Sequence, residues 1–149
     1  MDNLKFAAGP CPIGRGLARV GDAWSMMVLR DAGLGLARFD QFQKSLGIAP
    51  NILTRRLAAL TAARLLEKRR YSERPPRDEY VLTPAGRDFL PVLQAFGAWG
   101  GAHFGDGPIS RLVDATTGRA VEPLVVDRIS GQPLAEMALR VERPDGDAP

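Results

Sequence analysis

The stretch that decides the fold is RFDQFQKSLGIAPNILTRRLAALTAAR, residues 38–64. Gly47 divides it into two short segments, and Pro50 stands where a second helix, over about 50–64, can begin. Two short helices joined by a glycine-containing turn are typical of a helix-turn-helix. Apolar residues recur at helical spacing in both segments: Phe39, Phe42 and Leu46 in the first, Leu53, Leu57 and Leu60 in the second.

The polar face of the second segment has the residue types that contact DNA. Arginine can pair bidentately with guanine and asparagine with adenine in the major groove. A solvated helix face that contacts nothing is the alternative interpretation, and Arg56 can equally brace the fold through an acidic neighbour. The candidate contacts on and around this helix are Arg38, Pro50, Asn51, Thr54, Arg55 and Arg56.

A β-hairpin is predicted directly after this helix, over about 66–82. Two runs of strand-like period, 65–71 and 79–82, flank a tip at 72–78 that is rich in proline and arginine. A basic hairpin in this position is a wing, whose contacts to the backbone or minor groove position a protein on DNA without reading sequence. Its candidate contacts are Arg69, Arg70, Arg74 and Arg77, and a merely solubilising hairpin is the alternative.

Positive charge is concentrated in this part of the chain. Residues 38–80 hold ten basic and five acidic side chains, a net charge of +5, whereas the whole chain of 149 residues carries +3. The remainder is therefore net negative, at −2. Such focusing is expected if this third of the chain meets phosphate.

Further helices flank the motif. One is predicted to follow Pro12, a second to run from Ala23 to about Ala32 behind an Asp22 cap, and a long one to start after Thr83-Pro84. The long helix is so aromatic that a partner subunit is expected to bury part of it. Dimer interface or core is the simplest role, and an effector pocket the alternative, for Trp24, Met27, Phe96 and Trp99.

These patterns predict an α+β fold: a winged helix-turn-helix with extra dimerisation helices and a small C-terminal β-appendage. The expected division is a DNA-binding and dimerisation domain over 1–106, a β-rich appendage over 107–143, and a disordered tail over 144–149. Short strands are expected in the appendage at 112–113, 120–121, 124–126 and 137–141.

The motifs Cys11-Pro12, 21–24 (GDAW), Arg38-Phe39, 50–57 (PNILTRRL) and 80–86 (YVLTPAG) together resemble the HxlR family of winged-helix regulators. The resemblance runs in order from about Cys11 to Gly100. It implies a homodimer, formed through the N- and C-terminal helices, on a pseudo-palindromic operator in double-stranded DNA. Some members use a cysteine at the position of Cys11 to sense oxidants or electrophiles, although a small buried residue in the dimer interface is the simpler role for it here.

The C-terminal segment resembles a zinc-ribbon-like extension of some such regulators. The slots that hold cysteine or histidine there are filled here by Asp114, Thr117, Asp127 and Ser130, and the following glycines, Gly118 and Gly131, are retained. Zinc prefers sulfur and imidazole ligands. We therefore expect a relic of the ribbon that binds no metal.

Other classes of protein find little support. The chain has one histidine, His103, no nucleotide-binding loop and no paired catalytic carboxylates in a recognisable context, so neither an enzyme nor a cofactor is expected. The absence of a signal-like start or a long apolar run predicts a cytoplasmic protein without a membrane partner. The leading interpretation is a transcription regulator that binds a specific DNA sequence and responds to a small-molecule or oxidant effector. A nonspecific architectural DNA binder and a winged-helix protein-interaction module are the alternatives.

Overall fold

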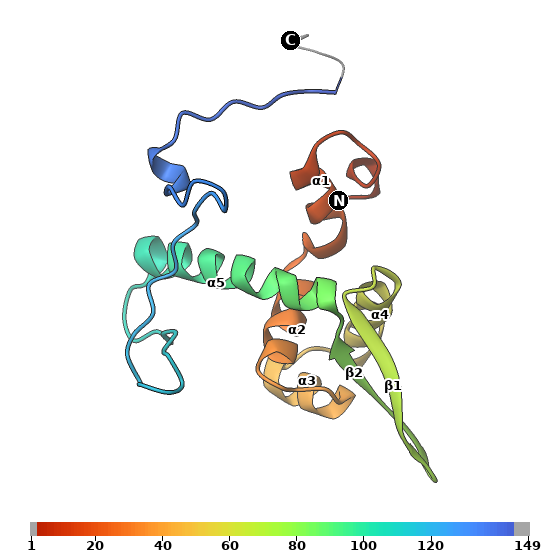
Figure 1. Cartoon of the computed structure of the whole chain (residues 1–149). Helices are drawn as coiled ribbons and strands as arrows, with labels where there is room; N and C mark the ends of the chain where they lie inside the picture. Colours follow the sequence, from red (N-terminus) through yellow and green to blue (C-terminus); the bar gives the residue numbers. More distant parts are fainter. Residues whose placement is uncertain (1–2, 145–149) are drawn as a thin grey trace. The chain divides into compact units, whose positions relative to one another are not determined.

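The computed structural model describes residues 3–144, and these form two compact units, up to Leu90 and from Pro91 onward (Figure 1). Of the expected disordered tail, 144–149, the structure describes Pro144 alone, and the rest lies outside the described residues. The first unit holds a 3₁₀ helix, η1 (Asn3–Phe6), and the helices α1 (Pro12–Val20), α2 (Ala23–Gly33), α3 (Phe39–Leu46) and α4 (Pro50–Ala62). The strands β1 (Leu66–Glu73) and β2 (Pro76–Leu82) follow, and then α5 (Pro84–Phe104), which continues into the second unit.

Local signals in the sequence set the helix ends. The Asp22 carboxylate accepts a hydrogen bond from the Ser25 backbone N–H at 2.9 Å and so caps α2. Gly47, with a φ of +60°, ends α3 in the left-handed conformation that glycine adopts most readily. Pro50 begins α4, where its missing N–H costs nothing. The predicted helix-turn-helix is therefore confirmed, with α3 and α4 as its two helices.

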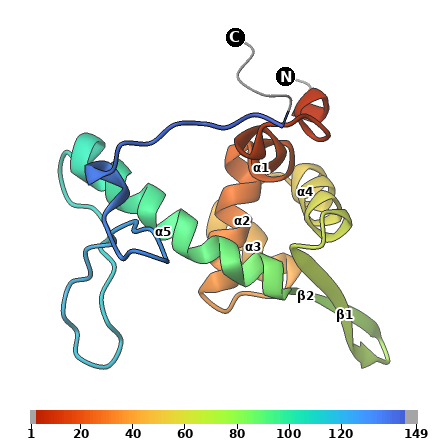
Figure 2. The ribbon, with the colours of Figure 1, turned by 45° about the horizontal axis from the view of Figure 1, so that its top comes forward.

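The core of the first unit lies between α2, α3, α4 and the start of the hairpin. α1 contacts both α2 and α4, as Figure 2 shows. Because the apolar face of α4 is buried in this core, the opposite, polar face of the helix points outward. Among the described residues, the fully buried large apolar side chains are Val28, Leu29, Phe42, Leu53, Leu57, Leu60 and Leu66.

The β1–β2 hairpin is the predicted wing. It is antiparallel, pairs Leu66 with Leu82 at its base and Glu73 with Pro76 at its tip, and extends away from the helices of its unit (Figure 1). The tip is tighter than the expected 72–78 segment, because the ladder continues to the Arg74-Pro75 turn. A bulge interrupts the ladder between Arg70 and Ser72.

The appendage, residues 107–143, has far less strand than the sequence predicted. Three of the four expected strands take part only in isolated bridges, Val113 with Ala120 and Val126 with Pro133, and the stretch 137–141 forms none. A 3₁₀ helix, η2 (Leu134–Glu136), was not foreseen. The apolar runs are too short to sustain a ladder, and Pro133 has no N–H to donate to one. The α+β winged fold is confirmed, but the prediction of four strands is wrong.

Candidate nucleic-acid interface

Helix α4 buries one face and exposes the other. Leu53, Leu57 and Leu60 are fully buried on its inner side. Asn51, Thr54 and Arg55 are exposed on the outer side. The hydroxyl of Thr54 donates to the Pro50 carbonyl at 2.9 Å, which leaves its oxygen lone pairs free to accept. The residues predicted to meet base edges thus share one accessible face of the recognition helix.

Two adjacent arginines of α4 have different surroundings. Arg56 Nε lies 3.3 Å from Asp22 Oδ1, so its charge pairs with the carboxylate that caps α2. Arg55 is exposed and has no ion-pair partner within residues 3–144. Of the two roles left open for Arg56, the geometry favours the brace, and Arg55 is the arginine of α4 that can reach a ligand.

Most cations at the base of the wing are neutralised within the wing. Arg69 pairs with Glu67 at 3.1 Å, and Arg70 donates to Asp78 at 2.8 Å. The Arg70 hydrogen bond, with help from Lys68, holds the pKa of the Asp78 carboxyl below its ordinary value. Hydrogen bonding and attraction from Arg69 likewise lower the pKa of Glu67. These pairs fix the hairpin but reduce its net charge.

The tip of the wing keeps its positive charge. Arg74 and Arg77 are exposed, and in the described part of the chain neither has an ion-pair partner. Ser72 donates its hydroxyl to the Pro75 carbonyl at 2.9 Å and thereby closes the turn between them. Of the four wing arginines predicted to contact DNA, these two are the ones whose guanidinium groups are available for phosphate.

A residue that the sequence analysis did not single out connects the wing to α3. Tyr71 lies at the bulge, between the pairs that Arg70 and Ser72 make with β2. The Arg38 guanidinium lies 4.7 Å from the centroid of its ring, a cation–π contact. Because a bulge re-aims a side chain, it lets Tyr71 meet Arg38 at the N-cap of α3. The contact lies at an irregularity of strand pairing, which no sequence pattern signalled.

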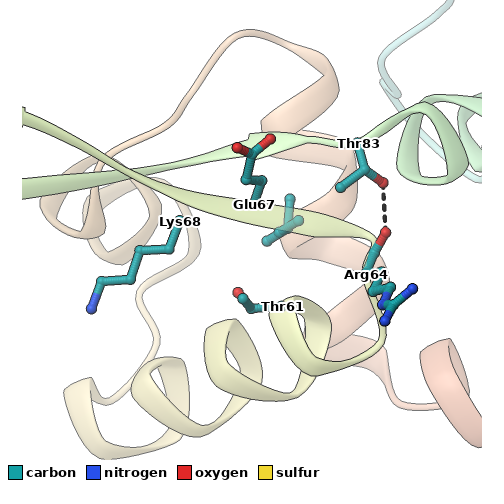
Figure 3. Close-up of a pocket in the computed structure, with 6 residues that line it drawn as sticks. Thr61, Arg64, Glu67, Lys68 and Thr83 are labelled. Atoms are coloured by element: carbon teal, nitrogen blue, oxygen red, sulfur yellow. Dashed lines mark hydrogen bonds between the residues drawn. The ribbon is translucent and has the colours of Figure 1, made fainter.

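The base of the wing is fastened to the end of α4 and to the start of α5. The Thr83 hydroxyl donates to the Arg64 carbonyl at 2.6 Å and accepts from the Gly86 N–H at 3.1 Å. Figure 3 shows the hydrogen bond between Thr83 and Arg64, at the edge of a shallow hollow of about 410 Å³ between α4 and β1. Gly86 has to be glycine here, because a Cβ would overlap the Leu65 carbonyl oxygen. One side chain thus sets the wing relative to the recognition helix.

Comparison with known proteins agrees with this arrangement. Residues 19–107, which include α2 to α5 and the wing, match the HxlR-like helix-turn-helix family. The chain belongs to the HxlR family. It is 34% identical over 124 residues to Rv3095 of Mycobacterium tuberculosis, an uncharacterised HTH-type transcriptional regulator, a match that covers 82% of this chain and 78% of the relative. This HxlR-family chain is accordingly a transcription regulator with a helix-turn-helix fold.

Two solved structures extend the similarity. PA1607, described as a proposed transcription factor, superposes with a TM-score of 0.84 at 40% identity and covers 93% of this chain and 98% of its own. The reduced form of the redox regulator HypR matches with a TM-score of 0.60 at 27% identity, over 63% of this chain and 94% of its own. The PA1607 match therefore includes much of the appendage, whereas the HypR match covers a shorter portion.

The residues predicted for an effector pocket or dimer interface are partly exposed. Trp24 and Met27, on α2, are 39% and 36% exposed, and Phe96 and Trp99, on α5, 54% and 53%. None of these four lines the hollow beside α4, the hollow between the 35–37 loop and β2, or the apolar cleft between α5 and the appendage, so an effector pocket among them stays a prediction.

Cys11 is exposed at the N-cap of α1, and its side chain makes no capping hydrogen bond. His103 stacks near Trp99, with ring centroids 6.0 Å apart, on the exposed part of α5. His103 itself is exposed at this position. A redox role for Cys11 stays a prediction.

The appendage turns are held by aspartates where the zinc-ribbon pattern has metal ligands. Asp114 accepts from the Thr116 N–H at 2.7 Å, and Asp127 accepts from the N–H and hydroxyl of Ser130 at 2.8 and 2.6 Å. The Ser130 hydroxyl and N–H lower the pKa of Asp127. Gly118 and Gly131, with φ of +70° and +73°, complete the turns as their positions predicted. No group of three metal-ligating side chains occurs in the part of the chain that the structure describes.

The same described residues include no helix that is both long and apolar enough to cross a membrane.

Proposed function

We propose that the chain acts as a homodimer that binds a specific, pseudo-palindromic site in double-stranded DNA. Helix α4 enters the major groove, and the β1–β2 wing rests on the backbone or in the minor groove. The observation that carries the proposal is the outer face of α4, where Asn51, Thr54 and Arg55 are exposed and Arg55 has no internal partner. These side chains can donate to and accept from base edges.

Charge supports the same assignment. Among the described cations of α4 and the wing, those without an ion-pair partner are Arg55 on α4 and Arg74 and Arg77 on the wing, so both elements keep positive charge. A winged helix that uses both elements meets the duplex at the base edges and at the phosphates beside them. The ion-paired cations of the wing base then serve to hold its shape.

The dimer is supported by the apolar face that α5 leaves uncovered in the second unit. Val92, Phe96 and Trp99 are each more than half exposed, and they recur at helical spacing. Trp99 also packs edge-on against Phe104, with ring centroids 5.3 Å apart. Large exposed apolar faces of this kind mark association surfaces. A second copy of the chain, related by two-fold symmetry, would cover it and would explain a palindromic site.

Selection of duplexes from a random library tests the proposal. The expected result is one enriched palindromic site, with half-sites about one helical turn, ~10 base pairs, apart. Sedimentation of the free protein should give a dimer. Enrichment of no sequence, together with weak binding to every duplex, would instead favour an architectural DNA binder. Binding to no duplex at all would favour a protein-interaction module.

A response to oxidant through Cys11 forms part of the proposal and has its own test. Its thiol is exposed, and the family resemblance includes members that sense oxidants with a cysteine at this position. A hydroperoxide would oxidise the Cys11 thiols of two chains to one disulfide and be reduced to alcohol and water. Loss of DNA binding after peroxide treatment in wild type, but not in Cys11→Ser, is the expected result. Identical responses would remove Cys11 from the account.

A further inference from the structure

An apolar cleft in the second unit lies beside the exposed face of α5, shares Val92 with it, and has no role in the proposed DNA contacts. Its volume is about 560 Å³, within the range of small-molecule sites. One wall is α5 and the other is the appendage. The lining includes Val92 and Ala95 from α5 and Leu112, Val121, Leu124 and Val125 from the appendage.

The walls are held by backbone hydrogen bonds and not by a hydrophobic core. Within the described residues 107–144 no side chain is fully buried. Val121 N–H donates to the Leu112 carbonyl at 2.9 Å, and Leu134 N–H donates to the Val125 carbonyl at 3.1 Å. These bonds lie beside the two aspartate-held turns at Asp114 and Asp127. The turns therefore present apolar residues to the cleft in a defined conformation.

The lining determines what kind of molecule fits. In a chain with 25% charged residues, no charged side chain is among the described residues that line the cleft. Burying an ionised ligand group there would cost free energy without a compensating partner. One side chain of the lining, Gln94, carries a carboxamide, and it has no hydrogen-bond partner within residues 3–144. The site suits an uncharged, largely apolar molecule with a single hydrogen-bonding group.

The cleft also includes the residue of α5 at which the first compact unit ends and the second begins. Pro91 lines it and is the first residue of the second unit. Proline has no N–H, so the Arg87 carbonyl loses its helical donor, and a helix is most easily bent at such a place. One residue earlier, Leu90 lies against Gly33, where a Cβ would come within 2.8 Å of Leu90 Cδ2. The helix is thus packed on α2 immediately before the residue that a ligand would contact.

We infer that this cleft binds a small, uncharged, predominantly apolar effector, and that the bound molecule changes DNA affinity through the Pro91 joint of α5. The regulatory half of the inference rests on the proposed DNA-binding function, whereas ligand binding does not. A second copy of the chain is the competing occupant. The ridge of Phe96 and Trp99 provides a surface for that copy outside the cleft lining, which leaves the cleft for a ligand.

Fluorescence titration of the full chain with N-phenyl-1-naphthylamine, an uncharged apolar probe, tests ligand binding without DNA. Wild type should show one saturable site per chain. Ala95→Trp fills the cleft and should weaken binding about tenfold or more, because overfilled sites resist occupation. Ala102→Trp, on the same helix but outside the lining, should change it less than about twofold.

A second pair of variants acts from the opposite wall. Leu124→Gln makes the lining polar at a residue that is 68% exposed, and Ile129→Gln makes the same kind of change at a 97% exposed residue outside the cleft. Only Leu124→Gln should weaken the probe. Equal probe binding by each variant and its control overturns the inference. So does sedimentation of Ala95→Trp and Leu124→Gln as monomers while their controls remain dimers, since a second copy then fills the cleft.

The regulatory half is tested by adding the probe to the complex with a selected duplex. Saturating probe should change the affinity of wild type for that duplex at least about threefold and leave Ala95→Trp unchanged. Equal DNA affinity with and without bound probe overturns the link to Pro91. If the protein binds no duplex while the cleft variants behave as expected, the ligand-binding half of the inference is kept and the proposed DNA-binding function is rejected.

Discussion

Replacing Thr83 with valine removes a hydroxyl that joins three elements while preserving the shape of the side chain. The hydroxyl donates to the Arg64 carbonyl at 2.6 Å, with a longer contact to the Leu65 carbonyl at 3.3 Å, and accepts from the Gly86 N–H at 3.1 Å, and all of these are lost. Loss of a helix cap costs about 1 kcal/mol. Loss of a further hydrogen bond costs about 1 kcal/mol. We expect Thr83→Val to lower the free energy of unfolding by about 2 kcal/mol in total.

Urea unfolding followed by far-UV circular dichroism, at one protein concentration for all variants, measures this loss. Thr83→Ser is the matched control, because it keeps the hydroxyl and removes only a methyl group. It should be more stable than Thr83→Val by at least about 1 kcal/mol. Equal stability of the two variants would refute the reasoning, since the hydroxyl would then contribute nothing to the joint of α4, wing and α5.

Three other perturbations test separate contacts. Arg64→Gly should stabilise the fold by about 1 kcal/mol in the same urea assay, because Arg64 has a φ of +58° that glycine adopts without strain; destabilisation would contradict this. Tyr71→Ala should free Arg38 and cost about 0.5–1 kcal/mol, with faster amide exchange in the wing than Tyr71→Phe shows. The lowered pKa of Asp78 means that its ion pairs stabilise the wing at neutral pH and are lost as the pH falls through that pKa, below the ordinary 3.8; an NMR titration of Asp78 at or above 3.8 would oppose it.

The helices of the first unit could be predicted because their ends are marked locally. Asp22, Gly47 and Pro50 act within a few residues of their own positions, and the leucine stripe of α4 follows helical spacing. The candidate recognition face followed from the same spacing, since the side opposite a buried stripe is the exposed one.

The features that could not be predicted from the sequence depend on contacts between residues far apart in the chain or on the geometry of strand pairing. Arg56 meets Asp22 across the fold, and nothing in the local sequence distinguishes it from Arg55. The Tyr71 bulge arises from the register of two strands. In the appendage, apolar pairs suggested strands, but short runs and Pro133 leave single bridges. Local signals therefore predicted elements, and tertiary contacts decided which arginines remain available.

The most direct test of the central claim is the ratio of affinities of the protein for its selected duplex and for a scrambled duplex. Arg55→Ala should lower this ratio about tenfold or more, since one bidentate base contact contributes about 1–3 kcal/mol of discrimination. Arg128→Ala, which removes the same charge from an exposed turn of the appendage, should leave the ratio unchanged. Equal ratios for wild type and Arg55→Ala would contradict the assignment of α4 as the element that reads DNA sequence.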